Sequence, residues 1–330
     1  MGFDQIIGHE RPISLLKAML ASGRLPHALL ISGPTGVGKA SLAKLVAMAA
    51  NCLGADPANP CGVCRACDKI RRGLHPDVSE IAPEGRARII KIETIRELRG
   101  NVAFKPYEGR TKVYIIRDAN RLHEAAANAL LKTLEEPPPD SLLILTAPEE
   151  TDLLPTIVSR CLRLKLAPLP KSTIEAWLRQ TKGMTGPIAS FLTALSEGCI
   201  GRINEMDGEV LWAYRGDIYD HLTKLVNVDD LDHLLKWAAQ LSGETEKWPD
   251  FYSMARLCFR DLMLAAGGVE DRHLVNLDLT DRIADMVAAR SVQNYIKALE
   301  HLERAEDALN RFIRPDLVFE DLLLSLGGVA

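Results

Sequence analysis

A glycine-rich turn near the start of the chain restricts the fold more than any other sequence feature. The apolar run Ala28–Ser32 predicts a short buried strand, and a helical pattern extends to about Ala50. Glycines between a strand and a helix let backbone N–H groups converge on phosphate oxygens at the start of the helix. A lysine at the end of the turn reaches the outer phosphates. The turn reads Gly33-Pro34-Thr35-Gly36-Val37-Gly38-Lys39, which predicts a phosphate loop.

Strand-like runs alternate with helical patterns through the first half of the chain. A helix over about 122–134 is stopped by Pro137-Pro138-Pro139. This alternation predicts an α/β fold with a parallel sheet and helices on both faces. The further predicted strands are Val113–Arg117, Leu142–Thr146 and Leu162–Leu166.

The composition changes after Leu166. Pro168 and Pro170 indicate a linker, Ser172 is expected to cap a helix over about 173–180, and the remaining pattern is helical. Trp212, Trp237, Trp248 and the amphipathic stretch Val292–Phe312 are candidate core or interface. We expect three domains: an α/β core over 1–167, a small helical domain over 168–207 and a larger all-helical domain over 208–330.

Two residues that hydrolysis needs are missing around the loop. The residue after the loop lysine normally supplies a hydroxyl to Mg²⁺, and here it is Ala40; Ser41 is rotated by about 100° along the helix. A working site also has an acidic pair after a neighbouring strand. Here Asp118 is followed by Ala119. We therefore predict no hydrolysis and leave open whether the loop, with Ser41 and Asp118, binds ATP or ADP.

Four of the seven cysteines cluster with a C-x8-C-x2-C-x2-C spacing. Four thiolates close a tetrahedral Zn²⁺ site and leave no position for a catalytic water, so the metal would be structural. An iron–sulfur cluster also uses four thiolates, and that alternative stays open. Clustered cysteines in a chain of this length indicate a reducing compartment. The predicted ligands are Cys52, Cys61, Cys64 and Cys67, in an insertion over about 52–67.

Charge disfavours a free-standing nucleic-acid binder. The chain has 40 Lys and Arg against 44 Asp and Glu, for a net charge of -4. Between Arg86 and Arg117, however, the sequence has nine basic residues and only three acidic ones. This local excess indicates either a solvated surface or a basic stripe that contacts duplex DNA. The first residues lack a leader pattern and no apolar run reaches the roughly 18 residues of a membrane span, so we expect a cytoplasmic protein.

Several motifs together resemble the clamp-loader branch of the AAA+ ATPases. They are the phosphate loop with its four-cysteine insertion, the stretch from Ala126 to Pro138 that reads AANALLKTLEEPP, and Ser159-Arg160-Cys161. The resemblance covers about residues 1–205. Within this branch, Ala40, Ala119 and the run from Asp118 to Asn128 resemble the delta-prime type of subunit. A tau-type chain is expected to extend beyond 330 residues.

The resemblance implies that the core over 1–167 is a AAA+ domain, that 168–207 form a lid and that 208–330 form a collar. It also implies a five-subunit assembly that opens a sliding clamp and loads it on primed DNA. The partners would be tau/gamma ATPase subunits, a delta subunit and the clamp. Arg160, after a short helix over 152–158, would act as an arginine finger on nucleotide held by a neighbouring subunit. Thr146 matches a position that senses the γ-phosphate, and Arg202 matches a lid arginine that contacts the nucleotide.

Two other functions compete with a non-hydrolysing assembly subunit. An active ATPase of the tau/gamma type would need Ser41 and another carboxylate, such as Glu124, to replace the missing groups. A zinc-dependent nucleic-acid reader is disfavoured by the acidic total.

Overall fold

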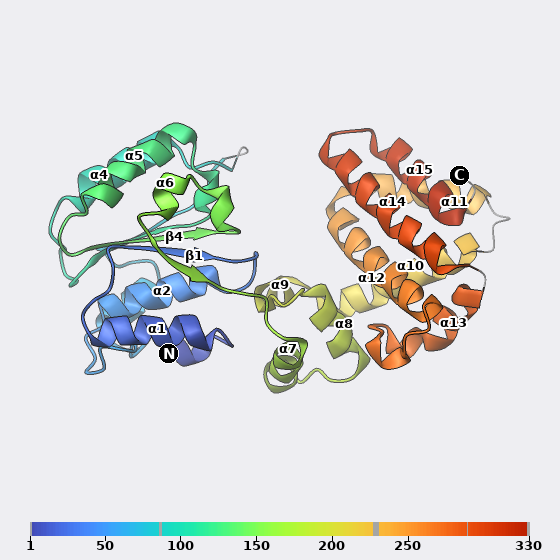
Figure 1. The fold of residues 1–330 in the computed structure, drawn as a ribbon, viewed down its shortest axis with the longest axis horizontal. Helices are drawn as coiled ribbons and strands as arrows, with labels where there is room; N and C mark the ends of the chain where they lie inside the picture. The colour runs from blue at the N-terminus through green and yellow to red at the C-terminus, as the bar shows by residue number, and fades with distance from the viewer. Residues whose placement is uncertain (1, 86–87, 227–230, 289, 329–330) are drawn as a thin grey trace. The chain divides into compact units, whose positions relative to one another are not determined.

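The first part of the chain folds around a five-stranded parallel sheet (Figure 1). The computed structural model describes residues 2–85, 88–226, 231–288 and 290–328. Strand order in the sheet is β2-β3-β4-β1-β5, which places the strand before the glycine-rich turn between two neighbours. The strands are β1 (Ala28–Ser32), β2 (Val78–Ile81), β3 (Lys112–Ile116), β4 (Ser141–Ala147) and β5 (Leu162–Lys165).

The four predicted strands are confirmed to within one residue at each end, but β2 was not predicted. Only Val78 and Ile81 of its four residues are apolar, so it carries too weak an apolar run to be recognised. It joins the sheet through parallel pairing with β3, in which Val78 lies opposite Val113 and Ile81 opposite Ile116. Pairing with a buried neighbour therefore fixes a strand that local pattern leaves undefined.

Helices cover both faces of the sheet, as predicted, because side chains alternate between the two faces along each strand. Leu29 and Ile31 of β1 pack in one core, and Ala28 and Leu30 pack in the other. The first core is covered by α1 (Glu10–Ala21), α2 (Lys39–Ala50) and α3 (Arg65–Arg71). The second is covered by α4 (Ile92–Val102), α5 (Glu124–Glu135) and α6 (Pro155–Val158).

Two helix boundaries differ from the prediction. The helix expected over 122–134 begins at Glu124, because His123 caps it and Ala119–Arg121 form a separate 3-10 turn. The helix expected over 152–158 is divided into a 3-10 turn at Glu150–Asp152 and α6. Pro155 starts α6, at a position where its missing N–H costs nothing.

From residue 171 onwards the described residues form helices and no strand, as predicted. The first of these helices, α7 (Lys171–Trp177), corrects one expectation, since Ser172 is its second residue and not its cap. The carbonyl of Pro170 accepts the N–H of Thr173 at 3.0 Å, so the turn begins earlier. A π-type turn at Leu178–Lys182 continues the helix and ends before Gly183. The later helices are α8 (Pro187–Leu195), α9 (Ile200–Glu205), α10 (Gly208–Val226), α11 (Leu231–Gly243), α12 (Trp248–Ala266), α13 (Thr280–Ala288), α14 (Val292–Asn310) and α15 (Pro315–Gly327).

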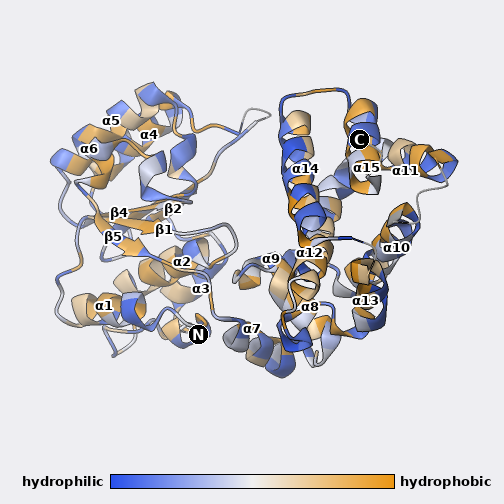
Figure 2. Cartoon of the chain, turned by 45° about the vertical axis from the view of Figure 1, so that its right-hand side comes forward, coloured by the Kyte–Doolittle hydropathy of each residue, from blue (hydrophilic) through white to orange (hydrophobic). Residues whose placement is uncertain are grey.

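Aromatic side chains fill the core of this helical part. Phe251 of α12 meets Trp237 of α11 at 6.0 Å and Phe319 of α15 at 5.8 Å between ring centroids. Trp237 is buried as predicted, whereas Trp212 and Trp248 are half-buried. Figure 2 shows the apolar side of α12 among these helices. None of the described helices is both long and apolar enough to span a bilayer.

The described part of the chain divides into two compact units. The first contains residues 1–173 and 198–202, and the second contains 174–197 and 203–330. The segment expected to form a lid therefore contributes residues to both units. The three-domain division stays a prediction.

Two buried polar side chains hold the loop before β3. Asp77 accepts the N–H groups of Tyr107, Glu108 and Gly109 at 2.7 to 2.8 Å. Asn51 accepts the N–H of the next two residues at 2.8 and 3.0 Å. Burial raises the pKa of the Asp77 carboxyl, but the three N–H groups outweigh burial, and its pKa lies below the ordinary value.

Asp77→Asn is expected to lower the free energy of unfolding by about 2 kcal/mol at neutral pH, because three N–H groups lose a charged acceptor. Urea unfolding measures this, with the half-exposed Asp68→Asn as a control that costs less than about 1 kcal/mol. A depressed pKa stabilises the fold above the ordinary carboxyl value of 3.8. The difference between the two chains therefore shrinks as pH falls through the lowered pKa of Asp77. A difference that is unchanged in acid would contradict this account.

Candidate functional site

The glycine-rich turn joins the carboxyl end of β1 to α2, at the edge of the sheet where α/β proteins bind ligands. Gly33, Gly36 and Gly38 have φ angles of +147°, +84° and +110°. Side chains disfavour these angles, and a Cβ on Gly33 would also lie 2.3 Å from the carbonyl oxygen of Leu166. The turn therefore requires glycine at these positions, in agreement with the predicted phosphate loop.

The Lys39 side chain forms hydrogen bonds to the backbone of this loop. Its Nζ donates to the carbonyl oxygens of Gly33 at 2.5 Å and Pro34 at 3.0 Å. The side chain is buried, and burial lowers the pKa of the amine, although the charge of Asp118 acts in the opposite direction. A phosphate entering the loop would have to replace these carbonyl partners.

A segment far along the chain packs directly on the loop. The N–H of Gly201 donates to the carbonyl of Gly36 at 2.8 Å, and a Cβ on Gly36 would lie 2.9 Å from the backbone nitrogen of Arg202. A Cβ on Gly201 would lie 2.7 Å from the Gly36 oxygen. Both glycines are thus needed for close backbone contact. Arg202, predicted from the resemblance, lies next to the loop.

The neighbouring strands bring two more predicted residues to this edge. The N–H of Asp118, which follows β3, donates to Oγ1 of the buried Thr146 of β4 at 3.1 Å. Asp118 adopts a left-handed backbone conformation with φ of +47°. Ala119, the next residue, is 1% exposed and packs in the core. The residue after Asp118 is thus a buried methyl group and not a carboxylate.

Ser41 does not lie at the loop in the way that Ala40 does. It follows Ala40 on α2 and its side chain is exposed. A residue one step along a helix is turned by about 100°, so the Ser41 side chain leaves α2 in a different direction from that of Ala40.

Arg160 lies in the turn between α6 and β5, and its guanidinium contacts its own unit. Nη2 forms an ion pair with Oε1 of Glu135 at 2.7 Å, and Nη1 donates to the carbonyl of Thr156 at 2.9 Å. Its side chain remains 35% exposed. The adjacent Cys161 is more enclosed, and burial raises the pKa of its thiol to about 12. Glu135 was not predicted as a site residue; its sequence signal is the acidic pair before the two prolines of the AANALLKTLEEPP stretch.

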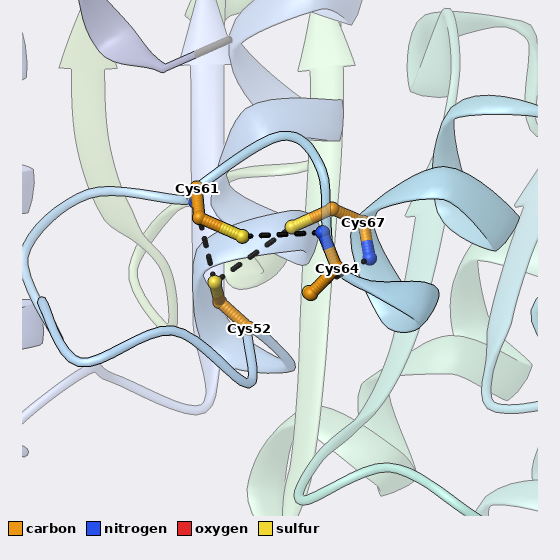
Figure 3. Close-up of side chains that lie close together, drawn as sticks. All are labelled: Cys52, Cys61, Cys64 and Cys67. Carbon is orange, nitrogen blue, oxygen red and sulfur yellow. Dashed lines mark hydrogen bonds between the residues drawn. The ribbon is translucent and has the colours of Figure 1, made fainter.

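The four clustered cysteines converge on one small volume, as predicted (Figure 3). Their Sγ atoms all lie within 4.8 Å of one another, and those of Cys52 and Cys67 are 3.7 Å apart. A tetrahedral site with Zn–S bonds of about 2.3 Å places sulfurs about 3.8 Å apart. The four sulfurs therefore fit Zn²⁺ with little rearrangement.

Backbone N–H groups support thiolate character in this cluster. The Cys61 N–H donates to Sγ of Cys52 at 3.2 Å, and the Cys64 N–H donates to Sγ of Cys61 at 3.3 Å. Hydrogen bonds from backbone N–H groups lower the pKa of Cys61 to about 6. Burial raises the pKa of the Cys67 thiol. Cys61 is half-buried and Cys67 is buried, so the cluster lies partly beneath the surface.

Some of the basic residues over 86–117 form contacts within the fold. Arg86 lies outside the described residues. Lys112 Nζ donates to the carbonyls of Asn101 at 2.9 Å and Phe104 at 3.2 Å, at the end of α4. Arg117 pairs with Glu80 of β2 at 3.1 Å. A DNA contact by the remaining exposed residues stays a prediction.

The purified chain is expected to contain one Zn²⁺, measured by metal analysis that also quantifies iron. Cys64→Ser removes one of four ligands and should abolish tight binding, whereas Cys161→Ser, outside the cluster, should retain the metal. Chelation should lower the midpoint of thermal unfolding, because metal binding is coupled to folding. A correctly folded chain with four reduced cysteines and no affinity for zinc would refute the assignment.

The chain is similar to known proteins of DNA polymerase III. Residues 8–170 match the model of a family described as "DNA polymerase III, delta subunit". The DNA polymerase III subunit tau/gamma of Haemophilus influenzae is 42% identical over 176 residues, which are 53% of this chain and 25% of that protein. Subunit tau of Bacillus subtilis is 30% identical over 326 residues, or 98% of this chain and 50% of that protein.

The chain spans half or less of the length of these two relatives. Among solved structures, a DNA polymerase III gamma subunit-related protein of Thermotoga maritima aligns with 96% of this chain and 99% of its own, at 18% identity and a TM-score of 0.45. The residues that the family model matches contain the glycine-rich turn, the four clustered cysteines and Arg160. Residues 8–170 are therefore similar to the family described as "DNA polymerase III, delta subunit", and the chain is also similar to tau and tau/gamma subunits.

Proposed function

We propose that the chain is a non-hydrolysing subunit of a DNA polymerase III clamp loader, of the delta-prime type. The observation that carries the proposal is a pair of alanines: Ala40, directly after the intact glycine-rich turn, and Ala119, which follows β3 and Asp118. The loop keeps its glycine geometry, but no hydroxyl follows Lys39 and no second carboxylate follows Asp118. The fold of an ATPase is thus retained without the groups that hold Mg²⁺ and orient water.

In this role the chain stiffens an assembly and completes the site of a neighbour. Its partners are tau/gamma-type ATPase subunits, a delta subunit and the sliding clamp, with primed DNA reached through the complex in the cytoplasm. Lys39, Thr146 and Arg202 form a residual nucleotide site, in which bound ATP or ADP would be structural. The four cysteines hold a structural Zn²⁺ in the insertion. The collar formed by the last helices joins the subunits.

Arg160 supplies the arginine finger. Its guanidinium is partly exposed and contacts the carboxylate of Glu135 and the carbonyl of Thr156. Neither of these residues belongs to the chain's own phosphate loop. Planar guanidinium groups bind phosphate oxygens through two parallel hydrogen bonds. A neighbouring subunit that presents a γ-phosphate here would gain stabilisation of the charge that develops in the transition state.

A second candidate is an active ATPase of the tau/gamma type. The identity to tau and tau/gamma subunits favours it. Against it stand the exposed Ser41 on the wrong face of α2 and the buried methyl group of Ala119. Glu124, the first residue of α5, lies beyond a 3-10 turn from Asp118 and is exposed.

Arg160→Ala is expected to reduce clamp-stimulated ATP hydrolysis at the neighbouring site by roughly 10³-fold, the lower end for loss of an arginine finger. Total ATP turnover of a reconstituted assembly should fall by the fraction of turnover that this site contributes. Arg163→Ala is the matched control, because Arg163 is also exposed and pairs with Glu150 at 3.5 Å. If Arg160→Ala behaves like Arg163→Ala, the finger assignment fails.

A further inference from the structure

Arg160 is held by a carboxylate of its own unit that must compete with any phosphate. Glu135 is the last residue of α5, and its Oε1 lies 2.7 Å from Nη2 of Arg160. Nη1 meanwhile donates to the Thr156 carbonyl of α6 at 2.9 Å and contacts the Ser159 hydroxyl at 3.4 Å. Both terminal nitrogens of the guanidinium are therefore engaged before a partner arrives.

The groups behind this pair are fixed, so the geometry is built into the fold. Leu134 and Ile157, which neighbour the pair in sequence, are 2% and 0% exposed and belong to the same core. The backbone N–H of Arg160 itself donates to the Ile157 carbonyl at 3.1 Å. The ends of α5 and α6 thus present the carboxylate and the guanidinium at a set distance.

The pair itself is weak enough to open. The side chains of Arg160 and Glu135 are 35% and 47% exposed, and exposed ion pairs contribute about 0.2–1 kcal/mol. A phosphate carries more charge and accepts two guanidinium N–H groups at once, so it can displace the carboxylate. The carboxylate thus keeps the guanidinium oriented until a phosphate replaces it as the partner.

We propose that Glu135 is a positioning residue that holds Arg160 in reserve and weakens its action on the neighbour's nucleotide. The proposal rests on the trans role of Arg160 proposed above. The carboxylate is the competitor of the γ-phosphate for one guanidinium, so its charge sets how strongly the finger stimulates hydrolysis. Removing that charge strengthens the finger.

Glu135→Gln tests this, because it keeps the shape of the side chain and removes its charge. In a reconstituted assembly, the variant should raise kcat/KM of clamp-stimulated ATP hydrolysis about two- to five-fold, the rate equivalent of the pair's weak attraction. The gain should diminish at high salt, which screens the half-exposed pair. Glu136→Gln removes the same charge from the next, also exposed, residue and should leave kcat/KM unchanged.

The Arg160→Ala background separates this proposal from the proposed function. If Arg160→Ala alone leaves hydrolysis unchanged, the trans role fails and the role of Glu135 fails with it. If Arg160→Ala lowers hydrolysis but Glu135→Gln fails to raise it, only the role of Glu135 is overturned. A gain from Glu135→Gln that persists in the Arg160→Ala background also overturns it, since the effect would then not act through the guanidinium.

A measurement on the free chain tests the contact without activity. Nitrogen NMR of arginine side chains reports the rotation of each guanidinium group. Rotation of the Arg160 guanidinium should become faster in Glu135→Gln and stay the same in Glu136→Gln. Equal rotation in all three chains would contradict the holding contact.

Discussion

The buried amine of Lys39 is the constraint on which the candidate nucleotide site depends. An ammonium group taken out of water needs hydrogen-bond acceptors, and here the carbonyls of Gly33 and Pro34 supply them. Those carbonyls point at the amine only because the glycines of the turn adopt angles that other residues avoid. Loop, lysine and α2 thus form one unit, which the contact of Gly201 with Gly36 extends to a distant segment.

The proposed function rests on a contrast between the residues that could bind a nucleotide and the residues that its hydrolysis requires. Glycines, a lysine, Asp118 and Thr146 remain at the carboxyl edge of the sheet. Two small residues, Ala40 and Ala119, stand where a hydroxyl and a carboxylate would act. Arg160 lies at the surface in a weak ion pair, in a form that a neighbouring phosphate can take over. The proposal that the chain completes another subunit's site rests on this surface arginine.

Much of the α/β unit could be predicted from the sequence, because its strands and loop have strong local patterns. The central strands are apolar runs, and the spacing of the cysteines predicted that their four sulfurs lie together. Strand β2 was missed because pairing with β3, and not its own composition, makes it a strand. The start of α7 was misplaced because the Pro170 carbonyl accepts the first-turn N–H, so the helix begins before Ser172.

Side-chain partners were less predictable than elements. Glu135 and Arg160 are 25 residues apart in the sequence and meet only because α5 and α6 pack in one core. Asp77 and Asn51 likewise hold a loop distant from them in the chain. Charge and spacing identify such residues as candidates but do not say which atoms they contact.

The central claim is that this chain does not hydrolyse nucleotide, and turnover by the purified chain tests it most directly. The zinc-loaded chain would be incubated alone with Mg²⁺-ATP, and phosphate release followed. The account predicts turnover far below roughly 1 s⁻¹, the low end for working enzymes. Turnover near that rate, abolished by Lys39→Ala, would contradict the account and establish an active ATPase.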